Sequence, residues 1–149
     1  MSAQHRAAPH SPWAPGSWHP ARLNQYDSVW LTILLIVVGV VRGYDYITPS
    51  HVASPSLAVV ESAMPMTVWG MAFGLPAIAL AFVALLRIHG GVWMCHWILA
   101  IIYAALAVGL GAEYITRPGF DGIRTAATLM VPAFLHLTIA LRTGWRPLR

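Results

Sequence analysis

The sequence has no lysine and few charged residues of any kind. Charged residues make up 9% of the chain and hydrophobic residues 58%, whereas an average soluble domain is about 25% charged. The basic residues are all arginines, and five acidic residues oppose them, which leaves a formal charge of +4. A soluble chain of 149 residues cannot cover that much apolar surface. The shortage of charge therefore indicates a lipid bilayer as the surrounding medium.

Other absences exclude whole classes of function. The arginines form no basic run, which argues against nucleic-acid binding. Cys95 is the only cysteine, so no disulfide can form within the chain. The sequence contains no nucleophile–base pair, phosphate-binding loop or carboxylate pair at catalytic spacing, and no thiol pair or haem-attachment motif. We therefore predict a protein that is not an enzyme, with no catalytic residues and no metal site.

Four apolar stretches follow residue 26, each close to the roughly 20 residues that span a hydrocarbon core. They cover about residues 28–46, 67–86, 92–112 and 125–141. Backbone amides in lipid must be paired within their own segment, so these stretches are predicted to be helices. Gly90-Gly91 is expected to separate the second and third helices, and a short interfacial helix is expected over 55–62. The predicted fold is an all-α integral membrane four-helix bundle over residues 26–149.

Residues 1–25 differ from the rest of the chain. They contain four prolines and no acidic residue before position 25, and proline prevents helix or sheet from propagating. We expect a disordered cytoplasmic tail. Six arginines lie in this tail, the second loop and the C-terminus, against three in the first and third loops. The positive-inside rule then places both termini in the cytoplasm and the chain in the inner membrane of the cell.

The two halves of the chain share short sequence elements. Residues 45–48 read Asp-Tyr-Ile-Thr and residues 113–116 read Glu-Tyr-Ile-Thr, while the second and fourth helices each contain Pro-Ala and end in Leu-Arg. The pattern predicts two similar helical hairpins in a parallel repeat, related by an axis along the membrane normal. Such a repeat would place a pair of similar acid–tyrosine sites on the outer face.

Small residues recur four positions apart on three of the predicted helices. This spacing lets helix backbones approach closely in lipid. The candidate packing positions are Gly39, Gly43, Gly70, Gly74, Ala105 and Gly109. Two interpretations remain open, namely packing within one chain and self-association of several copies into a ring.

Charged and aromatic residues form a second group of candidates toward the outer helix ends. They are Arg42, Asp45, Tyr46, Glu113, Tyr114 and Arg117. Opposite charges three or four positions apart stabilise a helix end, and tyrosine suits the membrane interface. A binding or proton-relay role is the alternative, because ionisable groups at membrane depth are costly to keep.

His96 and His136 are the candidate polar residues inside the membrane. His96 is expected about one turn inside the third helix from the cytoplasmic boundary, and His136 about a turn and a half inside the fourth. Their similar depths are compatible with two axial ligands to a haem. We favour interhelical hydrogen bonding or interfacial placement, so no cofactor is predicted, and haem is kept as the alternative.

Three short segments carry a resemblance to known proteins. They are Arg-Gly-Tyr-Asp-Tyr at 42–46, Asp-Gly-Ile-Arg at 121–124 and Arg-Thr-Gly-Trp-Arg-Pro at 142–147. Over residues 26–147 the chain resembles small four-pass membrane proteins encoded by phages of Actinobacteria. Such proteins look like members of lysis cassettes, in which four-pass holins or holin partners occur. The resemblance implies a phage setting and transfers no set of functional residues.

The leading hypothesis is a non-enzymatic, holin-like protein that associates with itself and alters membrane permeability. Its partners would be the lipid bilayer and further copies of the chain. One alternative is a membrane interaction module, such as a superinfection-exclusion factor that meets a membrane protein partner through the outer acid–tyrosine elements. The other alternative is a haem-binding four-helix membrane protein.

Overall fold

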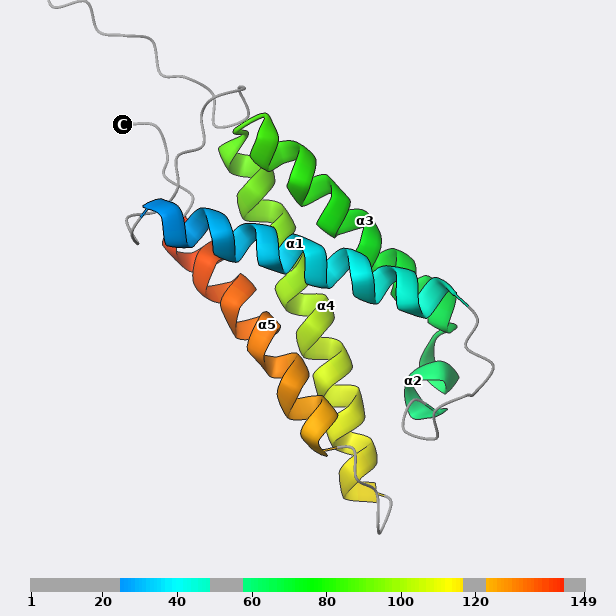
Figure 1. Ribbon diagram of the computed structural model, residues 1–149. Coiled ribbons are helices and arrows are strands. Elements are labelled where there is room, and N and C mark those ends of the chain that lie inside the picture. Colours follow the sequence, from blue (N-terminus) through cyan, green and yellow to red (C-terminus); the bar gives the residue numbers. More distant parts are fainter. Residues whose placement is uncertain (1–24, 49–57, 117–122, 144–149) are drawn as a thin grey trace, which may run out of the picture.

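The computed structural model describes residues 25–48, 58–116 and 123–143, and within these ranges the chain forms five helices and no strands (Figure 1). The helices are α1 (Gln25–Ile47), α2 (Ala58–Ala63), α3 (Met66–Leu85), α4 (His89–Thr116) and α5 (Ile123–Thr143). The predicted all-α fold is confirmed. Residues 1–24 of the predicted tail lie outside the described residues.

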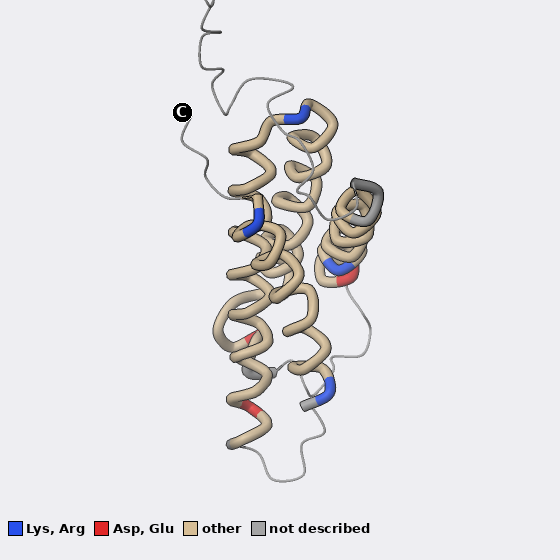
Figure 2. The backbone as a smooth tube through the Cα atoms, turned by 90° about the vertical axis from the view of Figure 1, so that its left-hand side faces the viewer, with Lys and Arg blue, Asp and Glu red and all other residues tan. Residues whose placement is uncertain are grey.

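Four of the helices are long and apolar enough to cross a bilayer. The spans are Ser28–Ile47, Met66–Leu85, His89–Ile115 and Arg124–Thr143, and they correspond to the four predicted stretches. Figure 2 shows long uncharged stretches on these helices, with the charged residues near helix ends. The chain is therefore a multi-pass membrane protein. The 28 residues of α4 extend over about 42 Å, more than a hydrocarbon core of roughly 30 Å, so its ends reach the interface.

The long helices pack as two pairs. α1 lies against α3 and α4 lies against α5, while a contact between α3 and α4 joins the two pairs. Figure 1 shows α4 and α5 side by side and α1 converging with α3 toward the C-terminal end of α1. This pairing agrees with the predicted division into two helical hairpins.

The core lies between α3, α4 and α5. Phe73 and Leu80 of α3 are completely buried, and Leu129 of α5 is nearly so. Buried positions on α4 recur every three or four residues, so one face of this helix points into the core. These positions are Val92, His96, Leu99, Tyr103, Leu106, Leu110 and Glu113.

α1 and α3 approach each other most closely at glycines. A Cβ atom added at Gly43 would lie 2.8 Å from the Cα atom of Gly74, and one added at Gly39 would lie 2.8 Å from the Cβ atom of Ala77. A Cβ atom at Gly70 would lie 2.7 Å from the carbonyl oxygen of Gly43. No side chain fits at these distances, so the three glycines serve packing within one chain.

The other small-residue candidates have more room. A Cβ atom added at Gly74 would lie 3.9 Å from the Cα atom of Gly43, and one at Gly109 would lie 3.8 Å from a methyl group of Val60 in α2. Both are ordinary van der Waals distances. Ala105 is exposed on α4. The spacing of small residues alone therefore does not distinguish positions that need glycine from positions that have room for a side chain.

The link between α3 and α4 differs from the prediction. Gly90-Gly91 is predicted to lie between the helices, whereas α4 begins at His89 and contains both glycines. The turn is formed by residues 86–88, where Arg87 takes a positive φ of 54°. A Cβ atom added at Gly91 would lie 2.7 Å from a methyl group of Val83. Glycine is needed there because α4 passes close to α3, and not because the chain turns.

Candidate functional site

Polar side chains from three membrane-spanning helices meet inside the bundle. We call this set the buried polar cluster. It consists of three fully buried residues, His96 and Tyr103 of α4 and His136 of α5, together with the half-buried Arg42 and Tyr46 of α1. Ionisable groups inside a bilayer are rare and mark functional positions by default. The cluster is therefore the candidate functional site.

His96 and His136 form a direct hydrogen bond between helices. Their Nδ1 atoms are 2.8 Å apart, their ring centroids are 5.0 Å apart, and both side chains are 0% exposed. His96 lies seven residues after the first residue of α4 (96 − 89), and His136 lies seven residues before the last residue of α5 (143 − 136). The two helices are antiparallel, so these equal offsets bring the rings to the same depth.

The hydrogen bond determines which ring nitrogens carry protons. A bond between two Nδ1 atoms needs one N–H donor and one bare nitrogen, so the two neutral rings are different tautomers. The Nε2 atoms of both rings are buried and have no hydrogen-bond partner within the described part of the chain. One of these Nε2 atoms is consequently a bare acceptor and the other an N–H donor.

Tyr103 connects the histidine pair to α1. Its ring stacks on His136 with centroids 5.7 Å apart and an interplanar angle of 20°. On another side, the guanidinium of Arg42 lies 5.9 Å from the Tyr103 ring. Arg42 also donates a hydrogen bond of 3.1 Å to the hydroxyl of Tyr46. The ring centroid of Phe73 in α3 lies 4.7 Å from that of Tyr103. Tyr103 of α4 therefore contacts side chains of α1, α3 and α5.

The cluster does not continue along α4 to the far end of the bundle. Glu113 lies on the same buried face as His96, 17 residues further along (113 − 96), or about 25 Å at roughly 1.5 Å per residue. Leu106 and Leu110 lie between Tyr103 and Glu113 and are completely buried. A proton relay between the buried polar cluster and Glu113 would therefore have to cross an apolar segment.

The two acid–tyrosine elements do not form the predicted pair of similar sites. Asp45 is exposed and Tyr46 is half-buried, whereas Glu113 is 1% exposed and Tyr114 is 41% exposed. The reason is visible in the spacing, because Asp45 follows Gly39 by six residues and Glu113 follows Gly109 by four. A difference of two residues rotates the element by about 200° around its helix, which is nearly the opposite face.

The expected ion pair on α1 is also absent. Within residues 25–48, Arg42 donates to Tyr46 and does not form a salt bridge with Asp45. Tyr46 lies one turn further along α1, so the guanidinium can rest on its ring as well as reach its hydroxyl. Arg117, which was grouped with these residues, lies outside the described residues.

The geometry of the histidine pair does not suit a haem. Two axial nitrogens, each about 2 Å from a metal, lie roughly 4 Å apart on opposite faces of the porphyrin. The Nδ1 atoms are 2.8 Å apart and bonded to each other, which leaves no space for a macrocycle between them. No group of three or more His, Cys, Asp or Glu residues that could hold a metal occurs in the described ranges. In this structure His96 and His136 therefore form a hydrogen-bonded pair.

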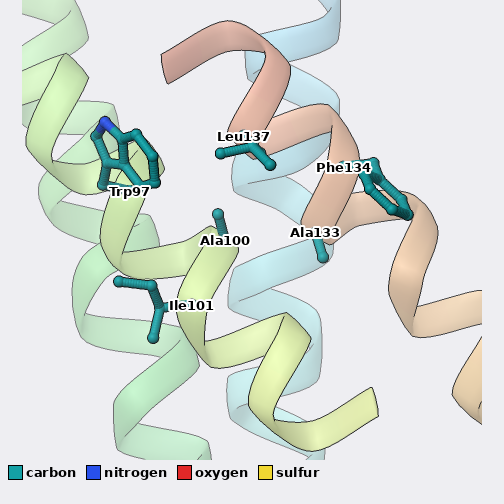
Figure 3. A pocket seen from close by; sticks show the side chains of 6 residues that line it. All are labelled: Trp97, Ala100, Ile101, Ala133, Phe134 and Leu137. Atoms are coloured by element: carbon teal, nitrogen blue, oxygen red, sulfur yellow. The ribbon is translucent and has the colours of Figure 1, made fainter. Parts of the chain in front are cut away.

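A shallow apolar groove lies between α4 and α5 (Figure 3). Ala100 and Ala133 leave the space, and Trp97 and Phe134 flank it, as Figure 3 shows. Its volume of about 170 Å³ is below the roughly 300–1,000 Å³ of small-molecule sites. With no polar lining, the groove offers nothing that would orient a specific ligand.

Tyr103 is the one residue of the cluster that is not among the candidates predicted from the sequence. Its signal is its position seven residues after His96, which places both on one face of a helix. Comparison of the chain with protein-family models, curated proteins and solved structures gives no match.

Proposed function

We propose that this chain is a holin-like protein that associates with copies of itself and thereby changes the permeability of the bilayer. The observation that supports this is a filled interior combined with apolar outer faces. Five side chains of α3 and α4 are completely buried, namely Phe73, Leu80, Leu99, Leu106 and Leu110. They block a path for solutes through the core of one chain. A permeable path would therefore form between chains.

α1 provides the face that we assign to contact between chains. Its glycine side packs on α3, and the opposite side exposes large apolar residues at spacings of three and four. These residues are Trp30 (68% exposed), Leu34 (56%), Val37 (51%), Val41 (61%) and Tyr44 (70%). Among the long helices α1 packs closely only on α3, so this whole side is available to a second chain.

The orientation that we propose places the α3–α4 turn in the cytoplasm. Arg87 lies in that turn, and Arg142 lies in the last turn of α5, at the same end of the antiparallel pair. Arg124 lies at the opposite end, in the first turn of α5. The proposed orientation follows the arginine count of the whole sequence, in which six arginines of the tail, the second loop and the C-terminus stand against three of the first and third loops. Both termini are then cytoplasmic, and the chain lies in the inner membrane of a cell carrying a phage.

Replacing Val37 with tryptophan tests the proposed face. Val37 is half-exposed in the middle of α1, so Val37→Trp should leave the single chain folded but obstruct the approach of a second chain. We expect chemical crosslinks between copies to fall by about tenfold, a loss of roughly 1.4 kcal/mol in association. Depolarisation of expressing bacteria, read with a voltage-sensitive dye, should be delayed in parallel.

The matched control is Val108→Trp, which adds the same side chain at a position 66% exposed on α4. It should crosslink and depolarise as the unmodified chain does. Equal loss in both variants would mean that bulk, and not the α1 face, decides association. A steady potential with the unmodified chain present in the membrane would refute the proposed function itself.

A further inference from the structure

The hydrogen bond between His96 and His136 can persist in two protonation states. In the neutral pair, an Nδ1–H of one ring donates to the bare Nδ1 of the other. One added proton gives an imidazolium that donates to a neutral imidazole, and the bond becomes charge-assisted and stronger. A second added proton leaves two N–H groups facing each other at 2.8 Å, and the bond is lost. The pair accommodates one extra proton but not two.

We propose that His96 and His136 form a proton-binding site that joins α4 to α5 more firmly when one proton is bound and releases the contact when a second proton binds. The first proton adds to the bare Nε2 atom, which is buried and has no hydrogen-bond partner in the described residues. An N–H bond forms there as an O–H bond of a hydronium ion breaks and water is released, and the positive charge is shared through the Nδ1–H···Nδ1 bond. His96 lies seven residues after the first residue of α4 (96 − 89), or about 10 Å from that helix end.

Of the groups around the pair, one attracts the positive charge of a bound proton and another repels it. Tyr103 stacks on His136, and the face of an aromatic ring attracts a cation. Arg42 of α1 lies against the same ring, and its charge repels a second cation. α3 contributes Phe73, which carries no charge. Apart from His136, the titratable groups of α5 are Arg124 and Arg142, at its two ends.

Along α4 itself, the other titratable groups lie to the side of the pair or at the helix ends. They are Cys95, Tyr103 and the terminal His89, Glu113 and Tyr114. No carboxylate is hydrogen-bonded to either imidazole in the described chain. An isolated charge is costly to bury. Sharing between two rings is therefore the main means by which this site can hold a proton.

The consequence for permeability rests on the proposed function, whereas the binding of the proton does not. α4 and α5 form one of the two closely packed helix pairs, and the histidine bond is buried in their contact. Loss of a charge-assisted bond corresponds to roughly a tenfold change in an equilibrium. We therefore expect leakage through vesicles containing the protein to rise by about that factor when the second proton binds.

The direct test is nitrogen-15 NMR of the full chain, labelled at histidine and held in phosphatidylcholine nanodiscs. We expect a through-bond coupling between the two Nδ1 atoms, and a first titration step in which the signals of both rings move together while the coupling remains. A second step at lower pH should abolish the coupling. The proposal would be overturned if the two rings titrated independently or if the coupling were absent. It would also be overturned if the pair took up no proton between about pH 4 and pH 8, the range around the ordinary titration of histidine.

Two variants make the assignment specific. His136→Gln should remove the coupling and the shared step, while His89→Gln, outside the pair at the start of α4, should change neither. If His136→Gln fails to fold, the coupling and the titration steps in the spectrum of the unmodified chain test the proposal on their own. Dye release from phosphatidylcholine vesicles is measured separately. Shared titration without any leakage would support the proton site and refute the proposed function, whereas leakage with independent titration would do the reverse.

Discussion

Gly43→Val is expected to destabilise the single folded chain by about 3 kcal/mol, at the upper end of the range for overpacked contacts. The added Cβ atom would lie 2.8 Å from both the Cα and N atoms of Gly74 and 2.9 Å from the carbonyl oxygen of Gly70. These are backbone atoms, so no side chain can rotate to relieve the clash, and α1 must move away from α3. Unfolding in mixed micelles with a denaturing detergent measures the loss.

The control for this prediction is Gly111→Val, because a Cβ atom at Gly111 meets nothing within 4 Å. It makes the same chemical change in a helix, so the difference between the two variants isolates the α1–α3 contact. The loss in Gly43→Val should not depend on protein concentration, since both partners belong to one chain. A loss that grows on dilution would instead place this glycine between chains, as in the self-association interpretation.

His136→Leu is expected to cost about 1–3 kcal/mol of unfolding free energy, the penalty for leaving a buried polar group without its partner. The substitution keeps the volume approximately but leaves Nδ1 of His96 facing a hydrocarbon. The double variant His96→Leu with His136→Leu should be less destabilised than the sum of the two single variants. From hydrogen bonds between membrane helices we expect a coupling of roughly 0.6–1.7 kcal/mol.

The same detergent unfolding measures this coupling. Trp97→Leu serves as the comparison, because its Nε1 atom is also buried without a partner in the described residues but does not belong to the pair. No coupling is expected between Trp97→Leu and His136→Leu. Strict additivity of the two histidine variants would show that the 2.8 Å contact contributes nothing to the stability of the bundle.

The four spans were predictable because hydrocarbon length and backbone pairing restrict the possible structures. The main error in extent is at α4, which was expected over about 92–112 and runs from His89 to Thr116. Gly90-Gly91 looks like a helix boundary in sequence, but glycine also permits close helix contact, and Val83 determines which role applies. That information lies in another helix, 8 residues away (91 − 83), and no local pattern contains it.

The candidate site was predictable in its depths but not in its contacts. Similar distances from the predicted membrane boundary indicate that His96 and His136 lie at one level, but the sequence does not give the rotation of each helix. Tyr103 was missed because a tyrosine in an apolar run looks like core. The expected similarity of Asp45 and Glu113 failed for a reason that was present in the sequence, namely the two-residue difference in spacing after Gly39 and Gly109.

The central claim, that this chain alone changes bilayer permeability by association, is tested most directly with purified protein in phosphatidylcholine vesicles. A potassium diffusion potential is set across the vesicles and read with a voltage-sensitive dye. The proposed function predicts that the potential collapses, and that the rate rises more steeply than linearly with the protein-to-lipid ratio. A potential that persists at every ratio, with the protein shown to be inserted, would contradict it.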